Sequence, residues 1–577
     1  MYLTSVWRSL KGRSLFILVS LSWLLLIAFL FAVTTVFERV PEESNALQAD
    51  NRYTKLNDRL NEANRQIDLL MAQNKQLAQH LQVLTELKVK REELSLESPK
   101  TNKKLKVRNR SPVNVFPSTE FELSFRRVRQ NIDEIWHHLR NRMSKKSMSF
   151  VNELRYNMIY DLDVLSDRDN RWRYEELKNL SNFVQNRIHR LQNPSDCGTA
   201  KKLVCDLNKS CGFGCQVHHL AHCFVAAMAL NRTLICDTDD WRTPSDQPNS
   251  WGRLFQPISQ TCGDPSGHNR TDWSDDKLLN SYQVLYYPII DYMQPIPPFL
   301  PLVIPTQIAD PLVRQSGEPF IWFIGQVLKY MMRPSSDMSQ YIDNFKRDNQ
   351  FKHPIVGIHV RRTDKIGTEA KFHTIHEYMF FVEDFYNKLD LKNERNSVHK
   401  KVERLVYLAT DEPEVWRKEI TPYQEKGYVF KGDIKLSESA DPYQRREFES
   451  LHNVVVDLLL LSQCDYIVCT FSSQICRLAF ELMQTRHSTQ DLSQAFYSLD
   501  DIYYFGGQVF HGKKALVSHS AQNDREISFK SGDILGIARN EHNGYNTGDH
   551  NRTKHKGLYP RFKVTEFVES VPFDVFD

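Results

Sequence analysis

Charged residues crowd at the end of one apolar segment. Residues 355–360 (IVGIHV) have the composition of a buried strand, and the next nine residues read RRTDKIGTE. A cation at a strand end could hold a phosphate, and a carboxylate there could act as a general base. Because successive strand residues point to opposite faces, we expect one of Arg361 and Arg362 to face a ligand and the other to form a structural ion pair. On its own, this cluster is equally compatible with a solvated turn.

Two further apolar segments also end in polar residues. The segment LVYLAT, which begins at Leu405, is followed by Asp-Glu, and DYIVCT, which begins at Asp465, is followed by Phe-Ser-Ser-Gln. The N–H groups after Ser473 could open a helix near Ile475, which is a favourable seat for a phosphate. With an arginine opposite that helix, a diphosphate could be held without a metal.

The elements that must position these residues form an α/β pattern. From about Cys197 onward, short apolar runs alternate with turn residues and helical stretches, as in RTLICDT, HPIVGIHV, RLVYLATD and SQCDYIVCTF. Such runs are typical of buried parallel strands covered by helices. An open α/β sheet binds its ligands beyond the carboxyl ends of its strands, which is where the polar residues stand.

The N-terminal region predicts a membrane anchor. Residues 14–37 carry no charge, and about 20 apolar residues suffice to cross a bilayer as a helix. Arg8, Lys11 and Arg13 precede this segment, so the positive-inside bias keeps residues 1–13 cytoplasmic and places the rest in the lumen. A cleaved signal peptide is the alternative, although its apolar core would be shorter.

The segment after the anchor predicts a stem. Apolar residues recur in alternating steps of three and four from Tyr53 to Leu84, with Asn74 as a polar seam position, which favours a coiled coil and self-association. A single amphipathic helix packed on the enzyme is the alternative. Residues 88–120 are basic and contain scattered prolines, as in a linker, and helical spacing resumes from Val128 towards Leu191.

Length, charge and cysteine usage narrow the class of protein. The 577 residues are enough for two or three domains, and the net charge of +4 gives no reason to expect binding to nucleic acid. In an oxidising lumen the ten cysteines favour disulfides, and CGFGC at 211–215 lacks the second Cys/His pair of a zinc site. N-glycosylation sequons begin at Asn179, Asn208, Asn231, Asn269 and Asn551.

The C-terminal residues predict a small barrel. Short strand patterns with turn signals between 501 and 568 favour an SH3-like domain. ALVSH at 515–519 and EHNGY at 541–545 stand where peptide-binding SH3 domains present aromatic residues, so a proline-binding groove is not expected. We expect the domain to position an acceptor or a dimer. The proline-rich run 294–305 could bind an SH3-type partner, but an internal linker is the favoured interpretation.

Three longer motifs identify a family. HVRRTDKIGTE at 359–369, CTFSSQIC at 469–476 and DIYYFGG at 501–507 closely resemble the eukaryotic α-1,6-fucosyltransferases. The resemblance covers roughly the whole chain, although the first 120 residues are similar in the type of segment more than in residue identity. The shorter pattern H-x-R-R-x-D is shared with α-1,2- and protein O-fucosyltransferases. Two alternatives are a different fucosyltransferase that uses the same donor, and a glycan-binding scaffold without activity.

The resemblance implies an architecture and a reaction. The reaction is inverting, metal-independent transfer of fucose from GDP-fucose, a co-substrate rather than a cofactor, to the innermost GlcNAc of N-glycans on glycoproteins. The protein would be a homodimeric type II protein of the Golgi membrane with a GT-B-like fold. The implied domains are a tail (1–13), an anchor (14–37), a coiled-coil stem (38–120), a helical region (121–195), a catalytic domain (196–500, donor half about 350–490) and an SH3-like domain (501–568).

The resemblance also implies roles for individual residues. Glu369 would be the general base, with Lys365 and Asp364 tuning its charge, although Glu369 could instead cap the helix that follows. Arg361 would stabilise the β-phosphate. The implied donor-binding set is Arg361, Arg362, His359, Asp457, Ser473, Gln474, Gly214 and Cys215, with His359 and Asp457 on the guanine.

Three further expectations concern the acceptor, the cysteines and metals. His519 is a candidate acceptor contact or an ordinary surface histidine. Residues 237–240 (DTDD) are the nearest match to a metal-binding DxD motif, and we interpret them as a loop, with no metal expected. The disulfides implied by the resemblance are Cys197–Cys262, Cys205–Cys223, Cys211–Cys215 and Cys469–Cys476, which leaves Cys236 and Cys464 without assigned partners.

Overall fold

The computed structural model describes most of the chain after the predicted stem. The chain divides into residues 1–113 and 114–577. The described residues are 116–577 apart from 141, 210, 237–249, 275–278, 365, 368, 369, 399, 400, 441–446, 487, 489, 490 and 509. The predicted anchor and coiled coil lie outside them. Within the described part, none of the helices combines the length and the apolar character that a membrane span requires.

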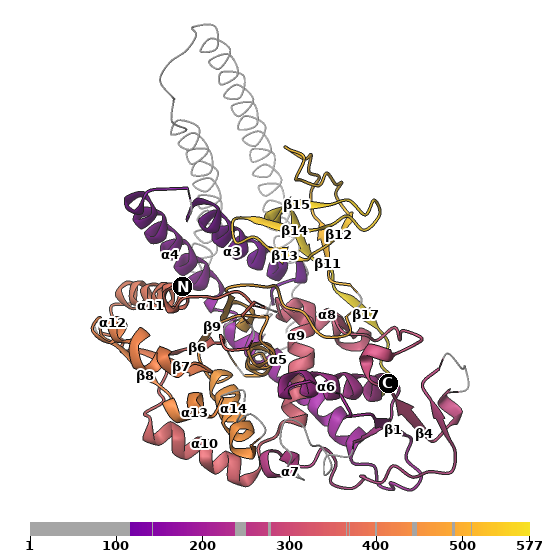
Figure 1. The fold of residues 1–577 in the computed structure, drawn as a ribbon. Coiled ribbons are helices and arrows are strands. Elements are labelled where there is room, and N and C mark those ends of the chain that lie inside the picture. Colours follow the sequence, from indigo (N-terminus) through magenta and orange to yellow (C-terminus); the bar gives the residue numbers. More distant parts are fainter. Residues whose placement is uncertain are drawn as a thin grey trace, which may run out of the picture. The chain divides into compact units, whose positions relative to one another are not determined.

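A five-stranded parallel sheet forms the half that the sequence predicted to bind the donor (Figure 1). The strand order is β10-β9-β6-β7-β8, with β6 in the centre and all six of its residues buried. The strands are β6 (Ile355–Val360), β7 (Arg404–Thr410), β8 (Tyr428–Lys431), β9 (Tyr466–Cys469) and β10 (Phe496–Ser498).

Alternate strand residues pack on opposite faces of this sheet. Val356 and Ile358 join a cluster with residues of α11, whereas Ile355 joins the main core with residues of α14. This alternation is the period of two of a strand with both faces covered. The helices of this half are α10 (Ser336–Asp348), α11 (Ile375–Arg395), α12 (Thr421–Gln424), α13 (Ile434–Ser439), α14 (Phe448–Leu461) and α15 (Gln474–Met483), and a π-helical turn covers Val415–Glu419.

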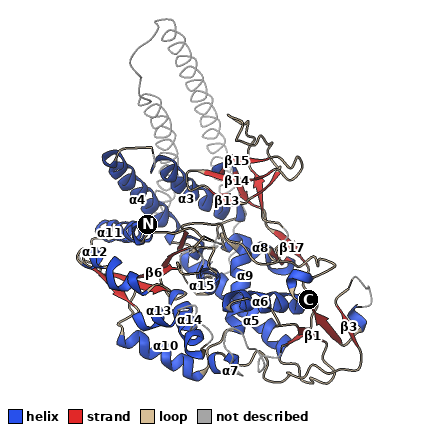
Figure 2. Ribbon diagram, in the orientation of Figure 1, coloured by secondary structure: helices blue, strands red, loops and turns tan. Residues whose placement is uncertain are grey.

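A second parallel sheet, of four strands in the order β2-β1-β4-β3, lies in the preceding part of the chain (Figure 2). Its core is continuous with that of the first sheet, because Leu203 and Leu405 belong to one apolar cluster. Two parallel sheets covered by helices confirm the predicted α/β class. The elements are β1 (Lys202–Cys205), α6 (Phe213–Ala229), β2 (Thr233–Ile235), α7 (Ser250–Leu254), β3 (Arg270–Asp272), β4 (Val284–Tyr287), β5 (Val303–Pro305), α8 (Thr306–Gln315) and α9 (Pro319–Met331), with 3₁₀ turns at Leu279–Ser281 and Ile290–Tyr292.

The proline-rich run is an internal connection. Phe299 and Leu300 are 5% and 7% exposed, and the run ends in the buried strand β5. Phe299 and Leu300 pack within their own protein and are therefore not presented to an SH3-type partner. This placement agrees with the linker interpretation.

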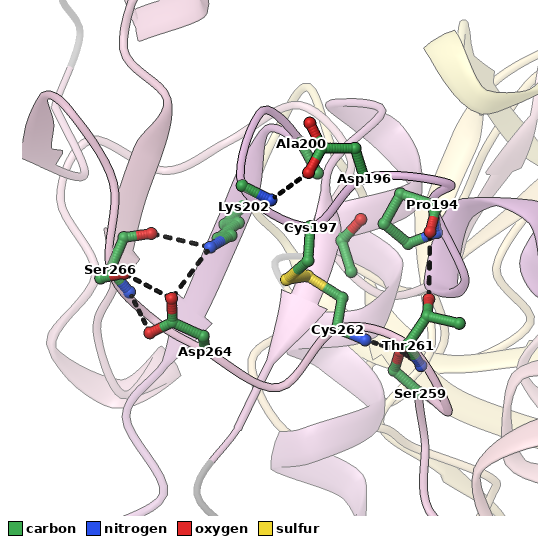
Figure 3. The surroundings of a disulfide bond; sticks show 12 residues. Pro194, Asp196, Cys197, Ala200, Lys202, Ser259, Thr261, Cys262, Asp264 and Ser266 are labelled. Carbon is green, nitrogen blue, oxygen red and sulfur yellow. Dashed lines mark hydrogen bonds and ion pairs between the residues drawn. A yellow bond between two sulfur atoms is a disulfide. The ribbon is translucent and has the colours of Figure 1, made fainter.

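All four disulfides implied by the resemblance are present, which confirms those pairings. They are Cys197–Cys262, Cys205–Cys223, Cys211–Cys215 and Cys469–Cys476. Figure 3 shows the first of them beside the buried Lys202, whose Nζ donates to the carbonyl oxygen of Ser266 at 2.7 Å. Cys464, which the resemblance left without an assigned partner, is a buried free thiol.

Three long helices precede the first sheet. They are α3 (Thr119–Arg140), α4 (Lys145–Asp167) and α5 (Asn170–Gln192). Arg155 of α4 is 6% exposed and bonds Asp133 of α3 and Asp384 of α11, each at 2.7 Å. Lys388 adds a contact to Asp384 at 2.8 Å, and Tyr156 donates to the same carboxylate at 2.9 Å. Burial raises the pKa of Asp384, but Lys388 and Arg155 outweigh it and hold that pKa below its usual value.

The C-terminal domain consists of two three-stranded antiparallel sheets, an arrangement that an SH3-like barrel requires. Its elements are β11 (Gly512–Ala515), β12 (Ile534–Gly536), β13 (Arg539–Asn540), β14 (Tyr545–Asp549), β15 (Lys556–Pro560), a 3₁₀ turn at Arg561–Lys563 and β16 (Val564–Glu566). Outside this domain, a 3₁₀ turn at Leu492–Gln494 precedes β10 of the five-stranded sheet. After β16 the chain leaves the C-terminal domain, and β17 (Glu569–Val571) pairs in parallel with β5 before a 3₁₀ turn at Asp574–Phe576.

The Arg155 network predicts unequal effects of two similar substitutions. Asp384→Asn leaves buried cations without a full counter-charge, so we expect a loss of roughly 3 kcal/mol in the free energy of unfolding. Asp161→Asn is the matched control, because Asp161 also joins α4 to α11, through Arg395, but is 60% exposed. The control should cost at most about 1 kcal/mol. Denaturant unfolding of both variants measures the difference, and equal losses would show that burial does not set the energy of this network.

Candidate active site

Polar groups meet at the carboxyl ends of β6, β7 and β9. His359 is the fifth residue of β6 and pairs with Ala409 of β7, while Asp411 directly follows β7. Val468 of β9 pairs with Ile358 on the other side of β6. The three strand ends singled out in the sequence therefore lie side by side at one edge of the sheet.

The two arginines after β6 have different partners. Arg361 contacts the carboxylates of Asp411 and Asp364, the latter at 2.5 Å. Arg362 is 3% exposed and bonds Glu412 at 3.0 Å and Glu419 at 2.5 Å. It also donates to the carbonyl oxygen of His373 through Nε and Nη2.

Arg362 therefore forms the structural ion pair expected of one of the two arginines. Its guanidinium fixes the loop between β6 and α11 rather than presenting donors to a ligand. We accordingly assign Arg362, which was included in the donor-binding set, a positioning role. Arg361 is 18% exposed and reaches the open end of the sheet.

The N-termini of α6 and α15 touch. Gly214 is the second residue of α6, and a Cβ added to it would lie 2.5 Å from Cβ of Gln474, the first residue of α15. The disulfides Cys211–Cys215 and Cys469–Cys476 close the two turns that lead into these helices. Helix N-termini carry partial positive charge and unpaired N–H groups, so two of them together favour an anion.

Ser473 stands at this junction as the N-cap of α15. It is 4% exposed, and its side chain makes no capping hydrogen bond. The hydroxyl is therefore not used by its own helix. The structure thus brings Gly214, Cys215, Ser473 and Gln474 together, as their assignment to one donor site requires.

Burial changes the pKa of both His359 and Asp457. Burial lowers the pKa of His359 to about 4, although the nearby charge of Asp411 raises it. The Nδ1 atom of His359 has no hydrogen-bond partner in the structure. Asp457 lies on α14 and accepts a 2.6 Å hydrogen bond from the hydroxyl of Tyr407. Burial raises the pKa of Asp457 to about 7, although the Tyr407 hydrogen bond lowers it. The orphaned nitrogen and the buried carboxyl group are suited to a polar ligand.

Lys365 and Glu369, two of the three catalytic residues implied by the resemblance, lie outside the described residues. Asp364 is described and bonds Arg361. The helix after the loop, α11, begins at Ile375 with Thr374 as its N-cap, and Glu377 completes a capping box. The cap that the alternative interpretation assigned to Glu369 is therefore supplied by other residues.

Comparison with known proteins decides the family. Residues 13–504 match the family described as α-(1,6)-fucosyltransferase N- and catalytic domains. The α-(1,6)-fucosyltransferase of Drosophila melanogaster is 37% identical over 481 residues, which cover 80% of this chain and 75% of that protein. The α-(1,6)-fucosyltransferase of Caenorhabditis elegans is 36% identical over 405 residues, 70% of each chain. The chain belongs to the α-(1,6)-fucosyltransferase family.

The chain is thus a fucosyltransferase, as its motifs predicted. Among solved structures, fucosyltransferase NodZ from Bradyrhizobium is similar over 49% of this chain and 92% of its own, at 13% identity and a TM-score of 0.29. A likeness of this size adds nothing to the family assignment, which is carried by the sequence matches.

The structure corrects one of the two interpretations of His519 in this fucosyltransferase. The side chain is 6% exposed inside the C-terminal domain. Its Nε2 lies 3.0 Å from the Glu526 carboxylate, and its Nδ1 lies 3.1 Å from Nζ of Lys563. His519 is therefore not an ordinary surface histidine, because its ring is held by partners within the domain, and its contact with an acceptor stays a prediction.

Two site residues of the fucosyltransferase were given no role from the sequence. Asp411 is 5% exposed and anchors the Arg361 loop, and its position directly after a strand was the available signal. His218 of α6 contacts Gln474 and Glu481. It had no such signal, because its partners are more than 250 residues away in the sequence.

Among the described residues, one group of side chains is close enough to hold a metal ion: Cys205, His219 and Cys223. The two sulfurs are joined as a disulfide, so they are not thiolate ligands. Residues 237–240, the DxD-like segment, lie outside the described residues.

The contact between the two helix N-termini predicts a steric effect. Gly214→Ala places a methyl group against Gln474, which must push α6 and α15 apart. We expect the affinity for GDP to fall about tenfold or more, because overpacking typically costs 1–3 kcal/mol, about 1.4 kcal/mol per factor of ten. Gly263→Ala is the control, since a Cβ there would meet no atom within 4 Å. Calorimetric titration with GDP measures both variants, and an unchanged affinity in Gly214→Ala would argue against a diphosphate at this junction.

The raised pKa of Asp457 predicts a pH dependence. An ionised carboxylate can accept hydrogen bonds from both N–H groups of a guanine edge, whereas a protonated one cannot. Since the pKa is about 7, lowering the pH through 7 should reduce the affinity for GDP by up to about tenfold per pH unit. Asp457→Asn should bind weakly at every pH and lose this step. Titrations on both sides of pH 7 test it, and a pH-independent affinity in the unsubstituted protein would remove Asp457 from the guanine site.

Proposed function

We propose that the protein transfers L-fucose from GDP-fucose, in α-1,6 linkage, to the innermost, asparagine-linked GlcNAc of N-glycans. The observation that carries this proposal is the α-(1,6)-fucosyltransferase match over residues 13–504. It is supported by the two helix N-termini that meet at Gly214 and Gln474, and by Arg361, which follows β6 at the carboxyl edge of a parallel sheet.

The donor occupies that edge. The diphosphate lies at the N-termini of α6 and α15, where Ser473, Gln474 and the N–H groups of Gly214 and Cys215 hold it. Arg361 exchanges its contacts with Asp364 and Asp411 for the β-phosphate. The guanine is bound by the buried residues His359 and Asp457.

The chemistry requires charge at two places. As the bond from fucose to the β-phosphate oxygen breaks, negative charge grows on GDP, and Arg361 stabilises it more in the transition state than in the ground state. Glu369 accepts the proton of the acceptor 6-hydroxyl, which attacks from the face opposite the leaving group and inverts the anomeric centre. Lys365 and Asp364 adjust the charge of Glu369. The reaction needs no metal ion in this scheme, because Arg361 and the two helix ends supply the positive charge.

The cellular setting follows from the N-terminal sequence. We place the catalytic part in the Golgi lumen behind a single anchor at residues 14–37, with the coiled-coil stem pairing two copies. Exposed asparagines in all five sequons support a glycosylated, lumenal protein. The C-terminal domain, which we regard as SH3-like, helps to position the glycoprotein acceptor.

Transfer by the full-length protein in detergent tests this proposal. Incubation with GDP-fucose, a GlcNAc-terminated N-glycopeptide and a chelator should add fucose to the innermost GlcNAc, located by mass spectrometry. Glu369→Gln should lower kcat by about 10²- to 10⁴-fold through loss of the base. Arg361→Ala should lower it by about 10²- to 10³-fold through loss of charge stabilisation.

The outcomes separate the rival explanations. Fucose on another sugar or on protein would indicate a different fucosyltransferase, and activity only without chelator would require a metal. A wild-type protein that binds GDP but transfers nothing would favour a glycan-binding scaffold. Transfer that survives Glu369→Gln unchanged would assign the base to another residue.

A further inference from the structure

The loop between β13 and β14 of the C-terminal domain reaches the carboxyl edge of the five-stranded sheet. His542 stands in this loop, and Nε2 of its ring lies 3.3 Å from the carbonyl oxygen of Asp500. Nδ1 of the same ring lies 2.8 Å from the hydroxyl of Tyr497 in β10. Asp500 is the second residue after β10, which pairs in parallel with β9. His542 therefore contacts the same edge of the sheet as the proposed donor site.

The partners of the His542 ring define which nitrogen donates. A carbonyl oxygen only accepts hydrogen bonds, so Nε2 carries a proton and donates to Asp500. The Tyr497 hydroxyl can donate or accept, so the hydrogen bond at Nδ1 forms in either protonation state of the ring. Turning the ring by half a turn about its bond to Cβ would place carbon atoms against both partners and remove both hydrogen bonds. The contact with Asp500 therefore requires no particular charge on the ring.

The backbone of the loop is fixed on both sides of this ring. His542 has a φ of 51°, in the left-handed region that is uncommon for a residue with a side chain. Its N–H donates to Oδ1 of Asn540 at 3.0 Å. The carbonyl oxygen of the next residue, Asn543, accepts a hydrogen bond from Nδ1 of His138 in α3 at 3.1 Å (Figure 1). Such a backbone conformation persists only where its surroundings hold it, and here they hold the ring at the edge of the sheet.

Asp500 connects this attachment to the turn that leads into α15. Its Oδ1 accepts the hydroxyl proton of Ser498 at 3.0 Å, and the oxygen of that hydroxyl accepts from the backbone N–H of Phe471 at 3.1 Å. The backbone N–H of Ser472 also donates to Oδ1 of Asp500, at 3.4 Å. The next residue, Ser473, is the N-cap of α15. Asp500 and Ser498 therefore hold the turn before the helix end to which we assign the diphosphate.

We propose that His542 is a positioning residue of the donor site, which fixes the backbone of Asp500 from the C-terminal domain and thereby the turn before α15. The inference rests on the proposed GDP-fucose site. His542 does not touch the donor in this scheme, but it gives the C-terminal domain a part in donor binding. That part is separate from the acceptor role that the sequence led us to expect.

Two substitutions of His542 separate this contact from the rest of the ring. His542→Gln places an amide NH2 near the position of Nε2 and can still donate to Asp500, whereas the shorter side chain of His542→Asn reaches only the position of Nδ1. Both variants lose the aromatic ring, so a general loss of packing should affect them equally.

Calorimetric titration of the full-length protein in detergent with GDP measures the effect. We expect the affinity for GDP to fall about 3- to 10-fold in His542→Asn, the size expected for one neutral hydrogen bond. In His542→Gln the affinity should stay within about twofold of that of the unsubstituted protein, because the donor to Asp500 is kept.

His138→Ala is the control for the attachment of the C-terminal domain. It removes a contact of the same loop with α3 but not the contact with Asp500, so its GDP affinity should match that of the unsubstituted protein. Equal losses in His542→Gln and His542→Asn, an unchanged affinity in His542→Asn, or a similar loss in His138→Ala would each overturn this inference alone. Failure of the unsubstituted, folded protein to bind GDP would instead remove the proposed donor site, and this inference with it.

Discussion

The Asp411 carboxylate determines how the chain leaves the central strand. It accepts hydrogen bonds from the backbone N–H groups of Arg362 at 2.9 Å and Thr363 at 3.1 Å, and it contacts the Arg361 guanidinium. Burial raises the pKa of Asp411, but Arg361 and these hydrogen bonds outweigh it and lower that pKa. The carboxylate therefore stays ionised and keeps Arg361 at the open end of the sheet, with Arg362 held on the Glu412 and Glu419 carboxylates. The position of Arg361, the cation that we propose to bind the β-phosphate, depends on this turn.

The second constraint is the contact between two helix ends. Gly214 is the residue that lets α6 approach α15, because any side chain would collide with Gln474. Two disulfides close the adjoining turns, and a buried contact between His218 and Glu481 also joins the two helices. The positive ends of both helices therefore act on one small volume, in which hydrogen bonds are stronger than in water.

The parts outside the two sheets are tied to the same framework. The Arg155 network joins α3 and α4 to α11, which follows β6 in the chain. The C-terminal residues leave their own domain, pair with β5 and bury Phe573 and Phe576 in the main core. Because these attachments are ionic, hydrogen-bonded and apolar together, the helical region and the C-terminal domain are integral to the catalytic body.

The sequence by itself determined the α/β class, the strand ends that carry polar residues, the family and, through the family, the disulfides. These follow from local composition and from long motifs, which are readable without knowing what lies nearby in space. Tertiary structure decided which arginine is structural, since Glu419 is 57 residues from Arg362. It also decided that His519 is buried, that Thr374 caps α11, and that His218 pairs with Glu481, 263 residues away. Each of these depends on a partner brought close only by folding, and no periodicity in the chain specifies such a partner.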